Sequence, residues 1–278
     1  MALTIANKSN STCGKYNFSI YSHTLTLEEL DSYILDTLFE EKKLNYLFQK
    51  DLPCSKKQGV IQLQKFIETS FANREDEVTD EEIDKFIDEG NKMKSYYTFF
   101  AEALLARLNI DYVDNDLVSG VIAVNENLTI VSTGADVCMF SDHTLVLGEA
   151  KFYGELYGGI SSIITDNSFN SKLEDYIKNI ISSTSEIIIK GITGDICEKT
   201  SADIKQMPLV LSGFVLHTKD SKNKYDSAYN LIDNVAISGF PDHYRIHLYH
   251  LPVDSKRNLI FKAQRKALDL IIALKTKK

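Results

Sequence analysis

The chain has 278 residues, of which 44% are hydrophobic and 25% are charged, and its formal net charge is −8. This composition excludes wholesale disorder, and the length suffices for one sizeable core with a smaller helical region beside it. The negative charge argues against a protein that coats DNA, because such binding depends on neutralising phosphates. We expect a soluble cytoplasmic protein, since no apolar run is long enough to span a membrane and the N-terminal residues do not resemble a signal peptide.

Residues 1–90 are predicted to be a helical N-terminal region. After an irregular start, Thr26 and Glu29 form a capping-box pattern ahead of apolar residues at helical spacing. Two further helices are expected over 58–72 and 79–90, the second of them strongly acidic. No chemistry can be read in this region, and we interpret it as a surface that docks a partner.

Residues 91–278 are predicted to form a mixed α/β domain. Its first element is a helix that is expected to be amphipathic, followed by three short strands and another helix. A nearly continuous apolar run then indicates a central strand covered on both faces, and a helix, a strand and a basic helix complete the chain. In chain order, the expected ranges are 94–110, 117–124, 127–140, 144–153, 168–182, 207–218, 225–236, 243–251 and a helix from about 255. This order is typical of an α/β sandwich.

Charged residues stand where the core of the sheet should be, at the ends of two neighbouring strands. Glu149 and Lys151 follow an apolar segment, and side chains two apart on a strand leave the same face. Short turns between antiparallel segments are expected to bring Asp136 beside Glu149. Two carboxylates suit Mg²⁺ and a lysine can orient an attacking water, so the set predicts phosphodiester hydrolysis. The alternative is that Glu149 and Lys151 form an exposed ion pair and Asp136 is a turn acid.

The stretch TGADVCMF and the later LVLGEAKFYGELYGGI together resemble the nuclease motif of the HamA family. This family supplies the nuclease subunit of the Hachiman anti-phage defence system and is a branch of the PD-(D/E)xK superfamily. Ala135 stands where the superfamily name has proline. The resemblance implies a restriction-endonuclease-like core in which Asp136, Glu149 and Lys151 are catalytic. It also implies that Asp136, Glu149 and the backbone carbonyl of Ala150 bind Mg²⁺ or Mn²⁺.

The resemblance further implies that the chain is the DNase effector of a helicase–nuclease complex, with the superfamily 2 helicase HamB as its partner and DNA as its substrate. The chain itself has no P-loop, because GITGDICEKT lacks the second glycine before its lysine. In the superfamily the helix before the strands often supplies another acid. Glu102 is the candidate here, as a metal ligand, a partner of Lys151 or a solvated residue. Two alternatives stay open: a catalytically silent nuclease-fold module that docks a helicase or DNA, and a nuclease that acts on RNA.

The C-terminal residues 252–278 carry eight bases against two acids. We predict that Lys262, Arg265 and Lys266 contact nucleic acid, with a solvated helix face as the alternative. The strand pattern sends His247 and His250 to opposite faces, so the two rings are not expected to share a metal. We interpret both histidines as strand-surface or interface residues.

Overall fold

A mixed β-sheet organises the computed structural model. The structure describes residues 3–10, 16–39, 95–124, 135–152, 173–182, 187–191, 196–218 and 244–255, together with the single positions 258, 259, 262 and 266. The helices in these ranges are α1 (Leu27–Phe39), α4 (Ser95–Tyr112), α6 (Glu174–Ser182) and α7 (Ser201–Gln206). The strands are β1 (Leu3–Asn10), β2 (Tyr16–His23), β3 (Val118–Val124), β4 (Val137–Phe140), β5 (Leu145–Phe152), β6 (Ile187–Gly191), β7 (Ile196–Lys199), β8 (Leu209–Thr218) and β9 (Tyr244–Val253).

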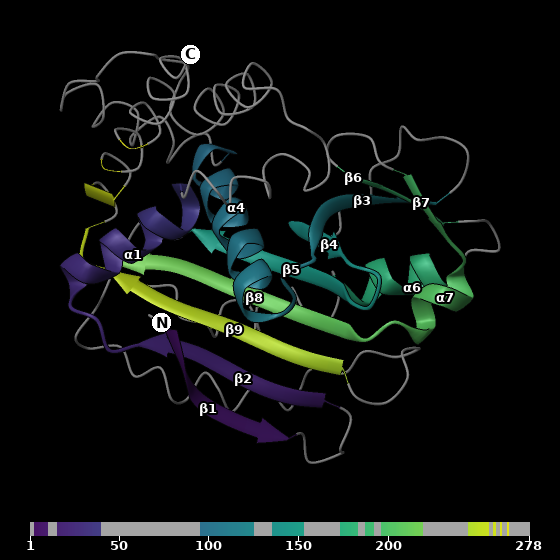
Figure 1. Ribbon diagram of the computed structural model, residues 1–278, viewed down its shortest axis with the longest axis horizontal. Coiled ribbons are helices and arrows are strands. Elements are labelled where there is room, and N and C mark those ends of the chain that lie inside the picture. The colour runs from purple at the N-terminus through teal and green to yellow at the C-terminus, as the bar shows by residue number, and fades with distance from the viewer. Residues whose placement is uncertain are drawn as a thin grey trace.

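The described strands form one sheet in the order β1-β2-β9-β8-β5-β4-β3-β6-β7 (Figure 1). The central strands β2, β9, β8 and β5 pair in parallel with one another. Antiparallel pairs extend the sheet on both sides, through β1 on one side and through β4, β3, β6 and β7 on the other. The strands nearest the middle are covered on both faces, which agrees with their continuous apolar sequences.

Helix α4 lies across β5 and β8, with α1 beside it (Figure 1). Leu104, Leu105 and Leu108 of α4 are fully buried, and so are Val146 on β5 and Val210 on β8. The core therefore sits between this helix and the parallel part of the sheet. No helix among the described residues is both long enough and apolar enough to cross a membrane.

The predicted mixed α/β class is confirmed, and so is the order of the main elements between residues 95 and 253. One expectation about α4 is wrong. Residues 104–109 are buried without a break, so in this stretch the helix is enclosed rather than amphipathic. Arg107 is only 1% exposed, and its guanidinium lies 2.6 Å from the carboxylate of Asp111, one turn later. A charged residue can be buried in this way because a partner neutralises it.

The irregular start expected ahead of Thr26 is wrong for residues 3–10 and 16–23, which form β1 and β2, so the region 1–90 is not helical throughout. Since β2 pairs with β9 from the far end of the chain, the predicted boundary at residue 90 separates strands that share one sheet. The apolar and polar residues of YNFSI alternate, which was an available strand signal, but the partner strand β9 is remote in sequence. The hairpin of β6 and β7 was also not expected. The helices predicted over 58–72, 79–90 and 225–236 lie outside the described residues.

The predicted start of α1 is confirmed by its hydrogen bonds. The Thr26 backbone N–H donates to Glu29 Oε2 at 2.8 Å, and the Glu29 N–H donates to Thr26 Oγ1 at 3.3 Å. This reciprocal pair satisfies two donors that the helix itself leaves open. The same hydrogen bonds hold the pKa of the Glu29 carboxyl below its ordinary value.

Candidate active site

Asp136 lies just before β4 and is tied to the backbone of β5 on both sides of Glu149. Its N–H donates to the carbonyl oxygen of Gly148 at 3.0 Å, and its Oδ2 accepts from the N–H of Ala150 at 3.0 Å. Val137 is the register partner of Gly148, and Asp136, one residue earlier, donates its N–H to the same Gly148. Asp136 therefore lies against the backbone of β5 on either side of Glu149, and the catalytic roles of the two acids stay predictions.

The two carboxylates differ in their exposure to water. Glu149, on the interior strand β5 between β4 and β8, is 0% exposed. Asp136 is half-buried, at the point where the chain enters β4. The predicted alternative of an exposed Glu149 in a surface ion pair is therefore wrong. Burial of a carboxylate costs several kcal/mol unless partners or a bound cation offset it, so a buried acid beside a second acid is well placed to hold a cation.

The turn between β4 and β5 sets the register that brings these acids together. The Ser141 N–H donates to the Thr144 carbonyl at 2.9 Å, and Ser141 Oγ accepts from the N–H groups of His143 and Thr144 at 3.2 and 3.1 Å. The same hydroxyl donates to Asp114 Oδ2 at 2.6 Å. Asp114 follows α4, so the hairpin is fastened to the end of that helix as well as closed on itself.

Gly148 marks a point of very close approach behind Glu149. A Cβ added at Gly148 would lie 2.6 Å from Ser212 Oγ on β8 and 2.9 Å from Leu105 Cδ2 on α4. Only glycine leaves room for both groups. Successive side chains on a strand alternate between its faces, so Glu149 extends from the face of β5 opposite to the one that α4 covers.

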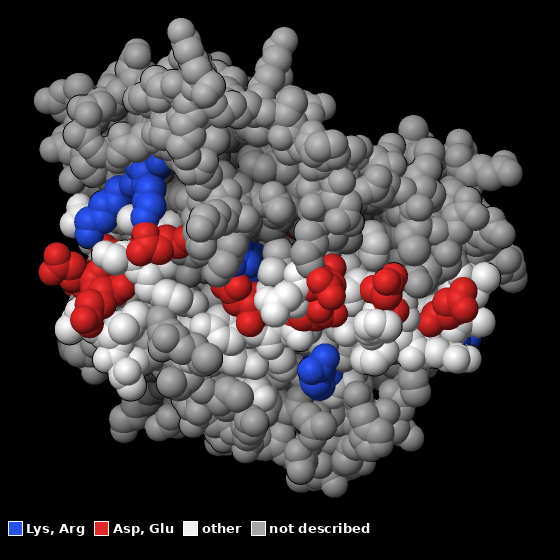
Figure 2. Space-filling model, viewed as in Figure 1, with Lys and Arg blue, Asp and Glu red and all other residues white. Residues whose placement is uncertain are grey.

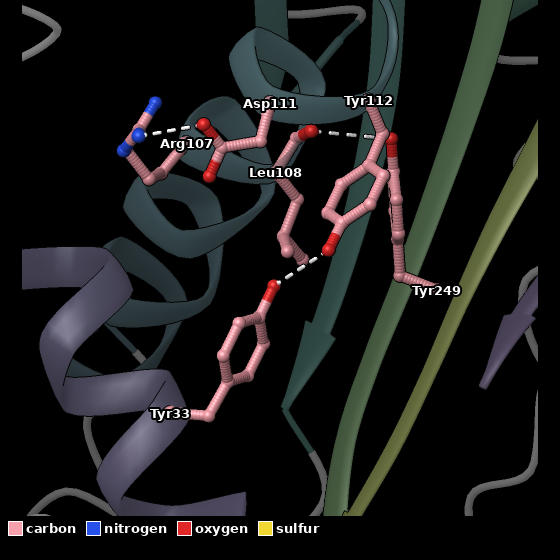
Figure 3. A network of polar contacts seen from close by, with 6 residues as sticks. All are labelled: Tyr33, Arg107, Leu108, Asp111, Tyr112 and Tyr249. Atoms are coloured by element: carbon pink, nitrogen blue, oxygen red, sulfur yellow. Dashed lines mark hydrogen bonds and ion pairs between the residues drawn. The ribbon is translucent and has the colours of Figure 1, made fainter. Parts of the chain in front are cut away.

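Buried polar groups that the sequence reasoning missed lie on the α4 side of the sheet. Asn109 Nδ2 donates to Ser212 Oγ at 3.0 Å, and the Tyr249 hydroxyl lies 3.3 Å from Asn109 Oδ1. The same hydroxyl lies 3.4 Å from the Leu108 carbonyl oxygen (Figure 3). Burial raises the pKa of Tyr249 well above its ordinary value, so its hydroxyl stays protonated and donates. The signal that could have revealed these groups is a serine inside the apolar run of β8 and an asparagine inside the apolar part of α4.

Tyrosines extend this polar layer towards α1. Tyr33 of α1 and Tyr112 of α4 share a hydrogen bond of 3.1 Å between their hydroxyls (Figure 3). Tyr21 of β2 stacks on Tyr249 with ring centroids 5.0 Å apart. Burial is the main cause that raises the pKa of Tyr21, an effect that the nearby Arg245 opposes. These rings join α1, α4, β2 and β9, and they are structural rather than part of the candidate site.

A divalent cation is the group that the sequence implies for this site. Carboxylate oxygens are the donors that Mg²⁺ prefers, and the ion is commonly held by one or two carboxylates plus waters and substrate phosphate. Asp136 and Glu149 fit that donor set. Among the described residues, no group of three His, Cys, Asp or Glu side chains is arranged to hold a metal ion. The side chains of Glu102 and Lys151 lie outside the described part of the chain, and the roles predicted for them and for the Ala150 carbonyl stay predictions.

The histidines of β9 lie inside the protein. His247 and His250 are each 6% exposed, because β9 is flanked by β2 and β8. The expectation that these histidines lie on the strand surface is therefore wrong. Their placement on opposite faces agrees with the prediction, because residues three positions apart on a strand point to opposite sides. His247 packs against Tyr21 with ring centroids 5.2 Å apart.

The C-terminal lysines predicted to bind nucleic acid are paired with acids of α1. Lys262 Nζ lies 2.9 Å from Asp31 Oδ2, and Lys266 forms an ion pair with Asp36. Figure 2 shows these basic side chains beside acidic ones over α1. Arg265 lies outside the described residues. The lysines thus have an intramolecular role, and a role in nucleic-acid binding would compete with it.

Comparison with known proteins yielded no relative. No protein-family model matches the chain, no curated protein is similar to it, and no solved structure matches its fold. The function is therefore inferred from the residues of the candidate site and from the chemistry they allow.

Proposed function

We propose that this chain is a metal-dependent deoxyribonuclease of the PD-(D/E)xK kind, with Asp136, Glu149 and Lys151 as its catalytic residues. The observation that carries the proposal is the direct attachment of Asp136 to the β5 backbone around the fully buried Glu149. An acid buried in β5 with a second acid bound to its backbone has a cost in stability unless partners or a cation offset it. A lysine two residues after Glu149 completes the set that phosphodiester hydrolysis needs.

The order of the elements supports the same proposal. Helix α4 is followed by the antiparallel strands β3, β4 and β5, then by α6, and then by β8, which pairs in parallel with β5. The resemblance to the HamA family, which rests on the motif around Asp136 and Glu149, covers this order of helix, three strands, helix and strand. The hairpin of β6 and β7 and the short α7 are inserted between α6 and β8.

In the proposed reaction Asp136 and Glu149 hold the cation next to the scissile phosphate. When bound, Mg²⁺ polarises the phosphorus–oxygen bond and favours deprotonation of the attacking water. The ammonium of Lys151 orients that water and offsets the negative charge that develops on the phosphate oxygens. The water oxygen forms the new bond to phosphorus, the bridging P–O bond breaks, and the leaving oxygen takes up a proton.

We further propose that the chain acts within a helicase–nuclease complex for anti-phage defence, with a superfamily 2 helicase of the HamB type as partner. The net charge of −8 opposes binding of free DNA, and acidic side chains run across the described part of the face that carries α1 and α4 (Figure 2). A partner that delivers DNA to the other face of the sheet removes this difficulty.

A second candidate is a catalytically silent module of the same fold that docks a helicase or DNA. The complete burial of Glu149 favours it, because an acid without access to water cannot contribute to hydrolysis unless the site opens. Turnover distinguishes the two candidates, and an RNA substrate in the same assay tests the remaining alternative.

The test is degradation of plasmid DNA and of RNA by the whole chain, with Mg²⁺ or with EDTA, and with or without the helicase. Glu149→Gln keeps the shape of the side chain and removes its charge. Asp142→Asn is the matched control, because Asp142 is an exposed acid in the turn between β4 and β5. The proposal expects Mg²⁺-dependent cleavage of DNA that Glu149→Gln abolishes and Asp142→Asn retains. Cleavage that persists in Glu149→Gln contradicts it, and absence of cleavage in every mixture favours the silent module.

A further inference from the structure

A chain of buried hydrogen bonds lies behind the candidate site, on the other face of the sheet. It runs from Ser212 on β8 to Asn109 on α4 and on to Tyr249 on β9, with heavy-atom distances of 3.0 and 3.3 Å. All three residues are 0% exposed. Asn109 links the other two residues, and the Tyr249 hydroxyl also lies 3.4 Å from the Leu108 carbonyl oxygen.

This series of hydrogen bonds reaches the candidate site through Gly148. Ser212 is the register partner of Gly148 in the parallel pair of β5 and β8, and its hydroxyl occupies the space that a side chain at Gly148 would fill. Leu105 of α4 approaches the same point. Helix α4 and the strands β5 and β8 are thus in contact at Gly148, one residue before Glu149.

The cost of an unsatisfied buried polar group explains why these hydrogen bonds fix the position of α4 on the sheet. A buried polar group left without a partner costs about 1 to 3 kcal/mol, whereas apolar contacts tolerate a small slide at little cost. A shift of α4 along the sheet would separate Asn109 from both Ser212 and Tyr249 at once. The hydrogen bonds between these three side chains consequently fix the position of α4 relative to β8 and β9.

The position of α4 matters to the candidate ligands because Leu105 packs against the Gly148 position, so a displaced helix changes the path of β5 next to Glu149.

We propose that Asn109, Ser212 and Tyr249 are positioning residues for the candidate metal site. They act through Gly148 and α4, they touch neither metal nor substrate, and their role rests on the proposed function. Loss of one link is expected to weaken metal binding in addition to lowering stability.

The experiment measures Mn²⁺ binding by isothermal titration calorimetry on the whole chain, together with thermal unfolding. Ser212→Ala removes the acceptor for Asn109, and Tyr249→Phe removes one hydroxyl at the other end and serves if Ser212→Ala does not fold. Tyr33→Phe is the control, because it deletes a hydroxyl bond of 3.1 Å between α1 and α4 that does not reach β5 or β8. Glu149→Gln reports whether the bound ion occupies the candidate site.

We expect Ser212→Ala and Tyr249→Phe to weaken Mn²⁺ binding by roughly tenfold, the low end of the range for groups that orient metal ligands. Tyr33→Phe is expected to lower the melting temperature without changing Mn²⁺ affinity. If the wild type binds Mn²⁺, Glu149→Gln abolishes binding and the two network variants bind like the wild type, the proposed function stands and the positioning role is wrong. If the wild type binds no Mn²⁺, or Glu149→Gln binds it unchanged, both proposals fall.

Discussion

Asp136 accepts a hydrogen bond from the backbone of Ala150, the residue that separates Glu149 from Lys151. One oxygen of Asp136 is thus engaged by β5 itself, which fixes the carboxylate beside the strand that carries the other two catalytic candidates. This contact makes the relative position of the acids a property of the hairpin rather than of a bound ion.

Replacing Lys151 by alanine is predicted to abolish DNA cleavage. The residue lies near the end of β5, where truncation removes a charge that the reaction needs. Gel assays of plasmid DNA give the activity, and circular dichroism with co-purification of the helicase shows whether fold and partner binding persist. Degradation at the wild-type rate by a folded Lys151→Ala protein would show that Lys151 is not catalytic.

Gly148→Ala is predicted to destabilise the protein by about 1 to 3 kcal/mol, as overpacked cores do. The added methyl group meets Ser212 Oγ and Leu105 Cδ2. Urea unfolding measures the loss. Combining the change with Ser212→Gly should restore part of the stability, since it removes the nearer of the two obstacles. No recovery in the double variant would show that the clash lies elsewhere.

The two lysines of the C-terminal segment are predicted to differ. Lys262→Ala leaves the buried carboxylate of Asp31 without its cation and should cost about 1 to 3 kcal/mol in unfolding experiments. Lys266→Ala breaks a more exposed pair and should cost about 0 to 1 kcal/mol. Equal losses for the two variants would contradict this distinction.

Binding of DNA by the same segment is tested by its salt dependence. Reversing the charges of Lys266 and Arg265 should reduce the slope of log affinity against log salt by roughly one unit for each phosphate that the segment no longer neutralises. An Asp36→Asn variant, which frees Lys266 from its ion pair, should bind DNA more tightly than the wild type. Unchanged slopes and affinities would leave these side chains with the intramolecular role alone.

Stability is predicted to fall at alkaline pH, in part through Tyr249. Its pKa is raised in the folded protein by burial, whereas in the unfolded chain it ionises near its ordinary value of about 10. The stabilising contribution is complete below pH 10 and is lost as the pH rises towards the folded-state pKa. Urea midpoints measured from pH 8 to 11 should therefore decline less steeply in Tyr249→Phe than in the wild type. Parallel declines would rule out this residue as a source.

Much of the candidate site could be predicted because it is local in sequence. Asp136 and Glu149 are joined by one short hairpin, so alternation and a tight turn suffice to place them together. The apolar runs of β5 and β8 likewise indicate central strands. The full burial of Glu149 could not be read in the same way, because it depends on the tertiary packing around β5 and not on the alternation of its own sequence.

The N-terminal strands and the buried polar chain escaped prediction for a related reason. The alternation in residues 16–20 could have indicated β2, but no local pattern reveals that it pairs with β9. Asn109, Ser212 and Tyr249 come from three separate elements, and only the fold shows that each satisfies another. The lysines of the C-terminal segment were predicted from charge alone, which cannot show that Asp31 and Asp36 lie beside them.

The pairing of Tyr16 on β2 with Tyr244 on β9 sets a constraint on how the protein is made. During synthesis the β1–β2 hairpin leaves the ribosome first, yet its parallel neighbour follows only after most of the remaining chain. Until then one edge of the hairpin is open to pairing with other chains, the situation that favours aggregation. Closing so large a loop also slows folding. We expect nascent chains that end before residue 244 to depend on chaperones, and release from them to coincide with the arrival of β9.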